Sequence, residues 1–112
     1  MPLNPTRTAL HNGATLLVKR STTTPAVAIT LTMRAGSIAD PPGLAGATWL
    51  LSRAIDRGTT TRSAAEIAEE PDSRGIALTI LVTRHAFSIG CCCLAEDFAP
   101  VLALLGDIVM SP

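Results

Sequence analysis

Three consecutive cysteines and two isolated histidines have the most reactive side chains in this chain. They are Cys91, Cys92 and Cys93, and His11 and His85. Thiolate and imidazole groups are common zinc ligands. If residues 91–93 are extended, however, the middle thiol points to the opposite face from its neighbours, so the three cannot easily surround one ion. We therefore expect core cysteines rather than a metal or redox site, and the odd number argues against a disulfide framework.

The two histidines make a poor metal site by themselves. His11 stands beside a turn and His85 near a strand junction, and neither has a carboxylate at a suitable local spacing. No His or Asp lies at a local spacing that marks a catalytic triad, although triads are recognised by geometry. Residues 43–46 (Gly-Leu-Ala-Gly) lack the Lys-Ser/Thr of a phosphate-binding loop. We interpret that segment as the entry to a helix.

The composition is that of a folded domain without overall charge. The chain has 112 residues, of which 47% are hydrophobic and 16% charged, so it is too apolar to be disordered. Nine basic residues balance nine acidic ones, which gives no general attraction to nucleic acid or anionic membranes. No signal peptide is visible, and the apolar runs at 14–18 and 76–82 are too short to span a bilayer. We expect a cytoplasmic protein.

Five segments have the patterns of β-strands. Asn12-Gly13 between two extended runs indicates a hairpin of residues 6–10 and 14–19, with a type I′ turn that needs positive φ at both central residues. Apolar residues alternate over residues 27–34 and again over 76–82, which predicts strands with one face on a core. Residues 86–94 are predicted to pair antiparallel with the strand before them.

Three further segments are predicted helices. They cover residues 44–55, residues 63 to about 70, and residues 98 to the last dipeptide. Ser63 and Glu66 have the spacing of a capping box. Pro71 should then shorten or kink the second helix, because it lacks an N–H and clashes with the preceding turn. The order βββααββα predicts an α+β fold, with three helices packed on one face of a mostly antiparallel sheet of about five strands.

Four stretches, taken in order, resemble the pitrilysin/insulinase family, which includes mitochondrial-processing-peptidase-like proteins. They are residues 10–18, residues 33–37 (Met-Arg-Ala-Gly-Ser), residues 58–67, and residues 72–75 (Asp-Ser-Arg-Gly) with the strands and helix that follow. The resemblance covers nearly the whole chain. It implies that residues 1–112 form one partial domain of this family, truncated at its C-terminal side.

Active members of that family carry H-x-x-E-H on the first helix, where two imidazoles bind zinc and the Glu polarises the bound water. Counting from both flanking stretches places this motif on residues 49–53, Trp-Leu-Leu-Ser-Arg. Trp49 and Arg53 stand at the histidine positions, and Ser52 stands at the Glu position. Indole offers only an N–H donor, Arg stays protonated, and a Ser hydroxyl is a weak base. The family's further acidic ligand lies beyond the end of this chain.

The resemblance therefore implies a homologue that is not an enzyme and needs no cofactor, whereas active members are zinc-dependent metalloendopeptidases. Inactive members pair with an active subunit or form half of a clam-shell chamber. We thus expect a second family subunit, self-association or extended peptides as partners. One alternative is an active zinc metalloendopeptidase with relocated ligands, drawn from the histidines and cysteines. The other is a purely structural or assembly module or fragment.

Trp49 and Arg53 are the candidate contacts to a substrate or partner. For Trp49 we favour a large apolar filler at a former metal site, because Trp is usually substantially buried. For Arg53 we favour a solvated or salt-bridged helix position over a group that holds a substrate carboxylate or carbonyl. For Ser52 we likewise favour an ordinary helix position over a substrate contact.

Overall fold

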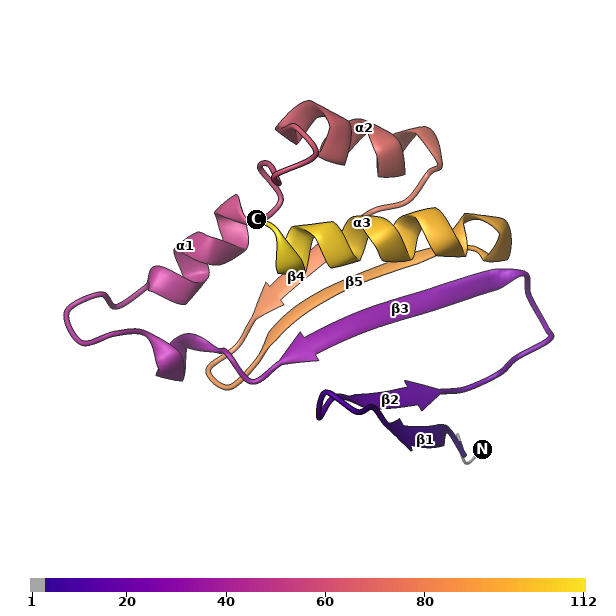
Figure 1. Cartoon of the computed structure of the whole chain (residues 1–112), viewed down its shortest axis with the longest axis horizontal. Helices are drawn as coiled ribbons and strands as arrows, with labels where there is room; N and C mark the ends of the chain where they lie inside the picture. Colours follow the sequence, from indigo (N-terminus) through magenta and orange to yellow (C-terminus); the bar gives the residue numbers. More distant parts are fainter. Residues whose placement is uncertain (1–3) are drawn as a thin grey trace.

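The computed structural model describes residues 4–112, and their elements follow the predicted order βββααββα (Figure 1). The strands are β1 (Thr6–Ala9), β2 (Thr15–Val18), β3 (Ala26–Met33), β4 (Thr79–Val82) and β5 (Phe87–Leu94). The helices are α1 (Ala47–Ala54), α2 (Ala64–Ser73) and α3 (Phe98–Met110), with short 3-10 turns at η1 (Ser37–Ala39) and η2 (Ala95–Asp97). The predicted α+β class is confirmed.

The five strands divide between two antiparallel sheets. β1 and β2 form a separate hairpin, and the second sheet has the order β3-β5-β4. β5 is the central strand of that second sheet: it pairs with β3 from Ala26↔Leu94 to Met33↔Phe87, and with β4 on its other side. β4 is consequently an edge strand. It begins at Thr79 rather than at residue 76 as predicted, because the Ile76 amide donates to the Pro71 carbonyl and closes the end of α2.

The core lies between one face of the three-stranded sheet and the apolar stripe of α3, which runs along β5 (Figure 1). Alternate residues of β5 face α3, and the buried α3 residues recur at helical spacing. The buried set from these two elements is Phe87, Ile89, Cys91, Cys93, Val101, Leu104, Leu105 and Ile108. Each large apolar side chain buried in this way contributes roughly 1.5–3 kcal/mol. Among residues 4–112, no helix is both long and apolar enough to cross a bilayer.

The cysteines occupy the positions that strand alternation predicts. Cys91 and Cys93 are buried in the core, and Cys92 is exposed on the other face of the sheet. Burial raises the pKa of both core thiols. The prediction of core cysteines is therefore confirmed for two of the three residues.

The first hairpin forms as predicted, but its turn is not type I′. Gly13 has φ +91°, whereas Asn4 is the only non-glycine among residues 4–112 with positive φ, so Asn12 does not meet the type I′ requirement. The Leu10 carbonyl accepts from the Gly13 amide at 3.0 Å, and the Leu10 amide donates to Ala14 at 2.8 Å. This is a three-residue loop that ends in a left-handed glycine. The Asn12 side chain instead accepts a hydrogen bond from the Ala14 amide.

The second helix begins as predicted and ends later. Ser63 and Glu66 form the full capping box, with each backbone amide donating to the other side chain at 2.7 and 3.2 Å. The expected end near Glu70 is wrong, since α2 continues through a buried Pro71 to Ser73. Pro71 stands in the last turns, where one missing N–H removes a single helical bond. Its carbonyl accepts from the amides of Arg74 and Ile76, which satisfies the helix end.

Candidate functional site

Helix α1 carries the three positions singled out by sequence, and Asp40 fixes its start. The Asp40 carboxylate accepts from the Gly46 amide at 2.8 Å, from the Thr48 amide at 2.9 Å and from the Thr48 hydroxyl. These bonds, the hydroxyl bond first, hold the pKa of Asp40 below its ordinary value. Gly46 is the N-cap residue with φ +93°, so residues 43–46 lead into the helix as interpreted.

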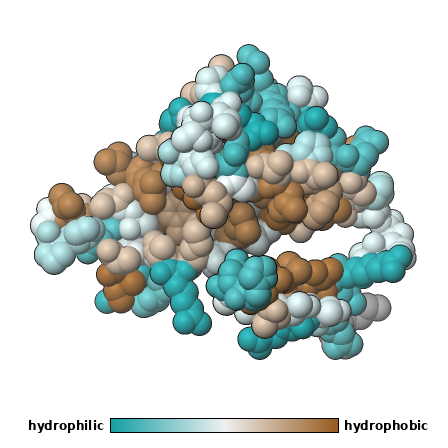
Figure 2. Space-filling model, in the orientation of Figure 1, coloured by the Kyte–Doolittle hydropathy of each residue, from teal (hydrophilic) through white to brown (hydrophobic). Residues whose placement is uncertain are grey.

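Trp49 lies on the surface, and its prediction as a buried filler is wrong. Its exposed fraction is 57%, and Leu50 beside it is 63% exposed. The physical reason is the position of α1, which contacts the edge strand β4 and η1 and has only Thr48 buried among its own residues. No layer of the described structure covers its outer face. Figure 2 shows hydrophobic patches at the α1 end, where they continue a band of hydrophobic surface across the middle of the molecule.

The three motif positions contact one another instead of converging on a common point. The Arg53 guanidinium stacks over the Trp49 ring, with 5.4 Å between its carbon and the ring centroid. The Ser52 hydroxyl donates to the Trp49 carbonyl at 2.5 Å. One turn later, Arg57 pairs with Asp56 at 3.7 Å. Within residues 4–112, no carboxylate lies within 4.0 Å of the Arg53 guanidinium, so the salt-bridged interpretation of Arg53 does not apply.

A groove with a volume of about 500 Å³ separates this face of α1 from β4. Trp49, Ser52, Arg53, Asp56 and Arg57 line its helical side, and residues 78–82 line its strand side. The helical wall thus carries two arginines, one aspartate, a serine and an exposed tryptophan, and the other wall is the backbone and mostly apolar side chains of an edge strand. The structure brings the three sequence-selected residues to the same groove.

The outer edge of β4 has unused peptide groups that face away from β5. The Thr83 amide donates to the Ala86 carbonyl at 2.9 Å, so Thr83 and Ala86 form a hydrogen-bonded pair. Hydrogen-bonded and non-hydrogen-bonded pairs alternate along an antiparallel ladder, so the next pair, Val82↔Phe87, is a non-hydrogen-bonded one. The alternation places the backbone N–H and C=O of Val82 and Ile80 on the outer side. Neither residue has a further backbone partner in the described part of the chain. Sequence reasoning missed this edge, because a strand's local pattern does not reveal which neighbour it lacks.

Zinc does not fit the side chains at the motif positions. The Trp49 indole and the Arg53 guanidinium have no lone pair available for a metal, and the Ser52 hydroxyl is already donated to a carbonyl. The other candidates lie apart: His11 is in the first hairpin turn and His85 in the β4–β5 turn, both exposed. Across residues 4–112, no three His, Cys, Asp or Glu side chains gather in a group that could hold a metal.

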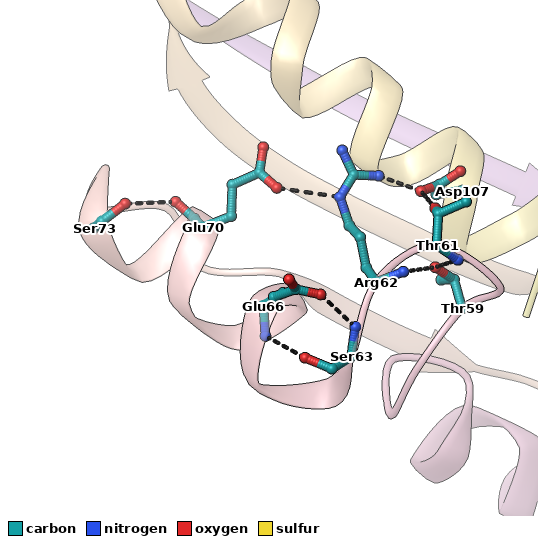
Figure 3. Close-up of polar contacts among 8 residues, drawn as sticks. All are labelled: Thr59, Thr61, Arg62, Ser63, Glu66, Glu70, Ser73 and Asp107. Carbon is teal, nitrogen blue, oxygen red and sulfur yellow. Dashed lines mark hydrogen bonds and ion pairs between the residues drawn. The ribbon is translucent and has the colours of Figure 1, made fainter.

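A second hollow, of about 810 Å³, lies between α2, α3 and the connection before α2. Arg62 crosses it, with its Nε 3.3 Å from Glu70 on α2 and its Nη1 on Asp107 of α3 (Figure 3). The Thr61 hydroxyl also donates to Asp107 at 2.7 Å. Because its one cation is already shared by two carboxylates, this hollow is a structural junction between helices.

Comparison with known proteins gives two sequence matches that cover most of the chain. The model of the family described as Insulinase (Peptidase family M16) matches residues 15–112. A protein described as an uncharacterized zinc protease from Rickettsia bellii (strain RML369-C) is 33% identical over 102 residues, which cover 91% of this chain and 25% of that relative. The chain therefore spans about a quarter of the length of that curated relative.

Proposed function

Because the chain belongs to the insulinase family, peptidase family M16, we propose that it is a non-catalytic member that binds extended peptides in the groove between α1 and β4. In this role it is a partner or chamber-wall subunit for peptide processing. The relative's description as a zinc protease refers to a chain about four times as long. The role in a larger assembly is therefore part of the proposal.

The open edge of β4 beside this groove carries the proposal. An extended peptide can add to a sheet edge by pairing its amides and carbonyls with those of the edge strand. Ile80 and Val82 offer an N–H and a C=O each, at the two-residue spacing of a β ladder. α1 stands alongside and supplies side chains that can contact those of the peptide. Backbone pairing accepts many sequences, as a chamber wall requires.

The side chains at the motif positions support the non-catalytic part. A zinc peptidase needs metal ligands and a general base at these points, whereas Trp49, Ser52 and Arg53 supply none. The exposed apolar residues on α1 support a covering partner, which we propose to be a second family subunit or another copy of this chain. The exposed apolar residues of α1 are the proposed contact surface.

Peptide binding can be tested by fluorescence anisotropy with a labelled, capped peptide of alternating Ser and Val. We expect Val82→Pro to abolish binding, because proline removes an outward N–H while leaving the bonds to β5 in place. Val82→Ala is the matched control, since it loses similar packing but keeps the amide. The same peptide N-methylated at alternate residues should also fail to bind. Equal binding by both variants would refute the edge-pairing proposal.

The non-catalytic part has a separate test. The purified chain, dialysed against zinc and then against buffer, should retain well under one equivalent by plasma mass spectrometry. It should also leave quenched fluorescent peptides uncleaved. Stoichiometric zinc, together with cleavage that a chelator abolishes, would instead establish a peptidase with relocated ligands.

A further inference from the structure

We infer that the groove between α1 and β4 selects extended peptides that carry a carboxylate side chain, and that Arg53 binds this carboxylate. The inference rests on the proposed peptide binding and adds the chemistry of the preferred ligand. It follows from the charges along the helical wall, from the stacking of Arg53 and from the distance of other carboxylates.

Arg53 is the cation in excess in this groove. The charged residues of the lining are Arg53, Asp56 and Arg57, and Asp56 is paired with Arg57. Arg57 is also directed back along the helix, because its Nε donates to the Arg53 carbonyl. The Arg53 guanidinium is thus the positive group left for an incoming anion. A carboxylate on the peptide would complete the charge balance of the groove.

Trp49 holds the Arg53 side chain in a conformation suited to binding a carboxylate. The guanidinium lies over the ring, and no hydrogen bond or ion pair in residues 4–112 uses its N–H donors, so they stay available. Those donors form a fork that matches the two oxygens of a carboxylate. Stacking also restricts the rotamers of a long side chain, so less conformational entropy is lost on binding.

The contact between Arg53 and a peptide carboxylate would also set the register in which the peptide pairs with β4. Side chains of an extended peptide alternate between two sides, so every second residue falls on the same side of the edge. One acidic residue opposite Arg53 would therefore favour one alignment of the peptide on Ile80 and Val82. Pairing with the edge supplies general affinity, and the Arg53 contact supplies selection among sequences.

A purely structural role for Arg53 makes different predictions. Arg53 lies in the last turn of α1, where a cation interacts favourably with the helix dipole. Such a role would affect the stability of α1 but would not discriminate between a charged and a neutral peptide. The comparison of peptides on the unaltered chain therefore separates the two roles without depending on the folding of any variant.

The experiment uses capped Ser/Val peptides in which a single Glu is moved along the sequence, each matched by a Gln peptide. By anisotropy at low ionic strength, the best Glu peptide should bind about 5-fold more tightly than its Gln partner. The difference should shrink as salt is added. Arg53→Gln should remove it, whereas Arg7→Gln, an exposed arginine on β1 outside the groove, should preserve it. Circular dichroism checks that both variants are folded.

The outcomes separate this inference from the function on which it rests. If the Glu and Gln peptides bind equally well to the unaltered chain, carboxylate selection is overturned and peptide binding stands. If Arg53→Gln keeps the full preference for Glu, Arg53 is not the selecting residue and the inference fails. If no peptide of either series binds, the proposed function fails and the inference fails with it.

Discussion

Thr48 donates two hydrogen bonds to the same oxygen of Asp40, one from its amide and one from its hydroxyl. This pair joins α1 to the loop that follows η1. Thr48 is the one buried residue within α1, so hydrogen bonds at the first turn hold this helix in place where other helices rely on a buried hydrophobic face. The same helix carries Trp49 and Arg53 into the groove.

Acid should weaken the hydrogen bonds by which Asp40 holds the start of α1. Hydrogen bonds lower the pKa of folded Asp40 below its ordinary value of 3.8. Its contribution to stability is therefore fully present above that value, and is lost as the pH falls through the lower pKa of the folded state. We expect the amides of Gly46 and Thr48 to lose protection in this acidic range, when NMR exchange rates are compared with those of an unfolded peptide at the same pH. Asp40→Asn should flatten this pH dependence, and an unchanged profile would contradict the assignment.

Arg62 should stabilise the contact between α2 and α3. Its side chain and those of Glu70 and Asp107 are about three-quarters buried, so water screens these pairs only in part. Arg62→Ala should lower the free energy of unfolding by about 1–3 kcal/mol in urea titrations. Arg62→Lys should recover only part of this loss, since one ammonium cannot fork between two carboxylates. A double-mutant cycle with Asp107→Ala isolates the pair, and purely additive losses would contradict coupling.

Pro71→Leu should raise the stability of the chain. Leucine restores an N–H within α2 and removes the steric conflict with the preceding turn, which costs up to about 3 kcal/mol in a helix interior. The gain should be smaller here because Pro71 lies near the end of α2 and is buried. Pro71→Ala also restores the amide but leaves a space. A melting temperature that falls in both variants would show that the proline ring is needed for packing.

Gly36 and Gly106 should respond to alanine in opposite directions. A Cβ on Gly36 would collide with backbone atoms of Thr83, Arg84 and Ala86, at the point where residues 37 and 38 pair with that turn. Gly36→Ala should therefore unfold the chain or strongly destabilise it. A Cβ on Gly106, in α3, would meet nothing within 4 Å. Gly106→Ala should stabilise by about 0.5–1 kcal/mol in the same urea titration.

Cys92 should be the fast-reacting thiol. It is exposed, whereas Cys91 and Cys93 are buried and have pKa values raised mainly by that burial. Titration of the native chain with Ellman's reagent at neutral pH should show one rapid equivalent, and Cys92→Ser should remove it. A rapid phase that persists in Cys92→Ser would mean that the core opens readily.

The sequence was most informative where a local pattern and the final packing agree. Alternation over β5 correctly assigned Cys91 and Cys93 to the core. The Ser63–Glu66 spacing correctly gave the start of α2. Strand alternation and a capping box both depend on neighbours within a few residues, so the sequence alone shows them. The predicted end of α2 before Pro71 was wrong. The lost helical hydrogen bond at Pro71 is outweighed by the burial of its ring and by the two amides that donate to its carbonyl.

The site was predicted in part. Counting along the chain located Trp49, Ser52 and Arg53 on one helix, and the structure places them in one groove. The exposure of Trp49 was not predictable, because it depends on what α1 packs against and not on residue type. The free edge of β4 likewise follows from the strand order, in which a later segment, β5, takes the central place.

That central position of β5 has a consequence for the order in which the protein can be made. β3 and β4 each pair only with β5 in the second sheet, and neither pairs with the other. During synthesis, both strands leave the ribosome before their shared partner exists. The sheet must then assemble late, by long-range contacts that form slowly. Until residue 94 has emerged, β3 and β4 lack their common partner, and unpaired strands of this kind are prone to aggregation.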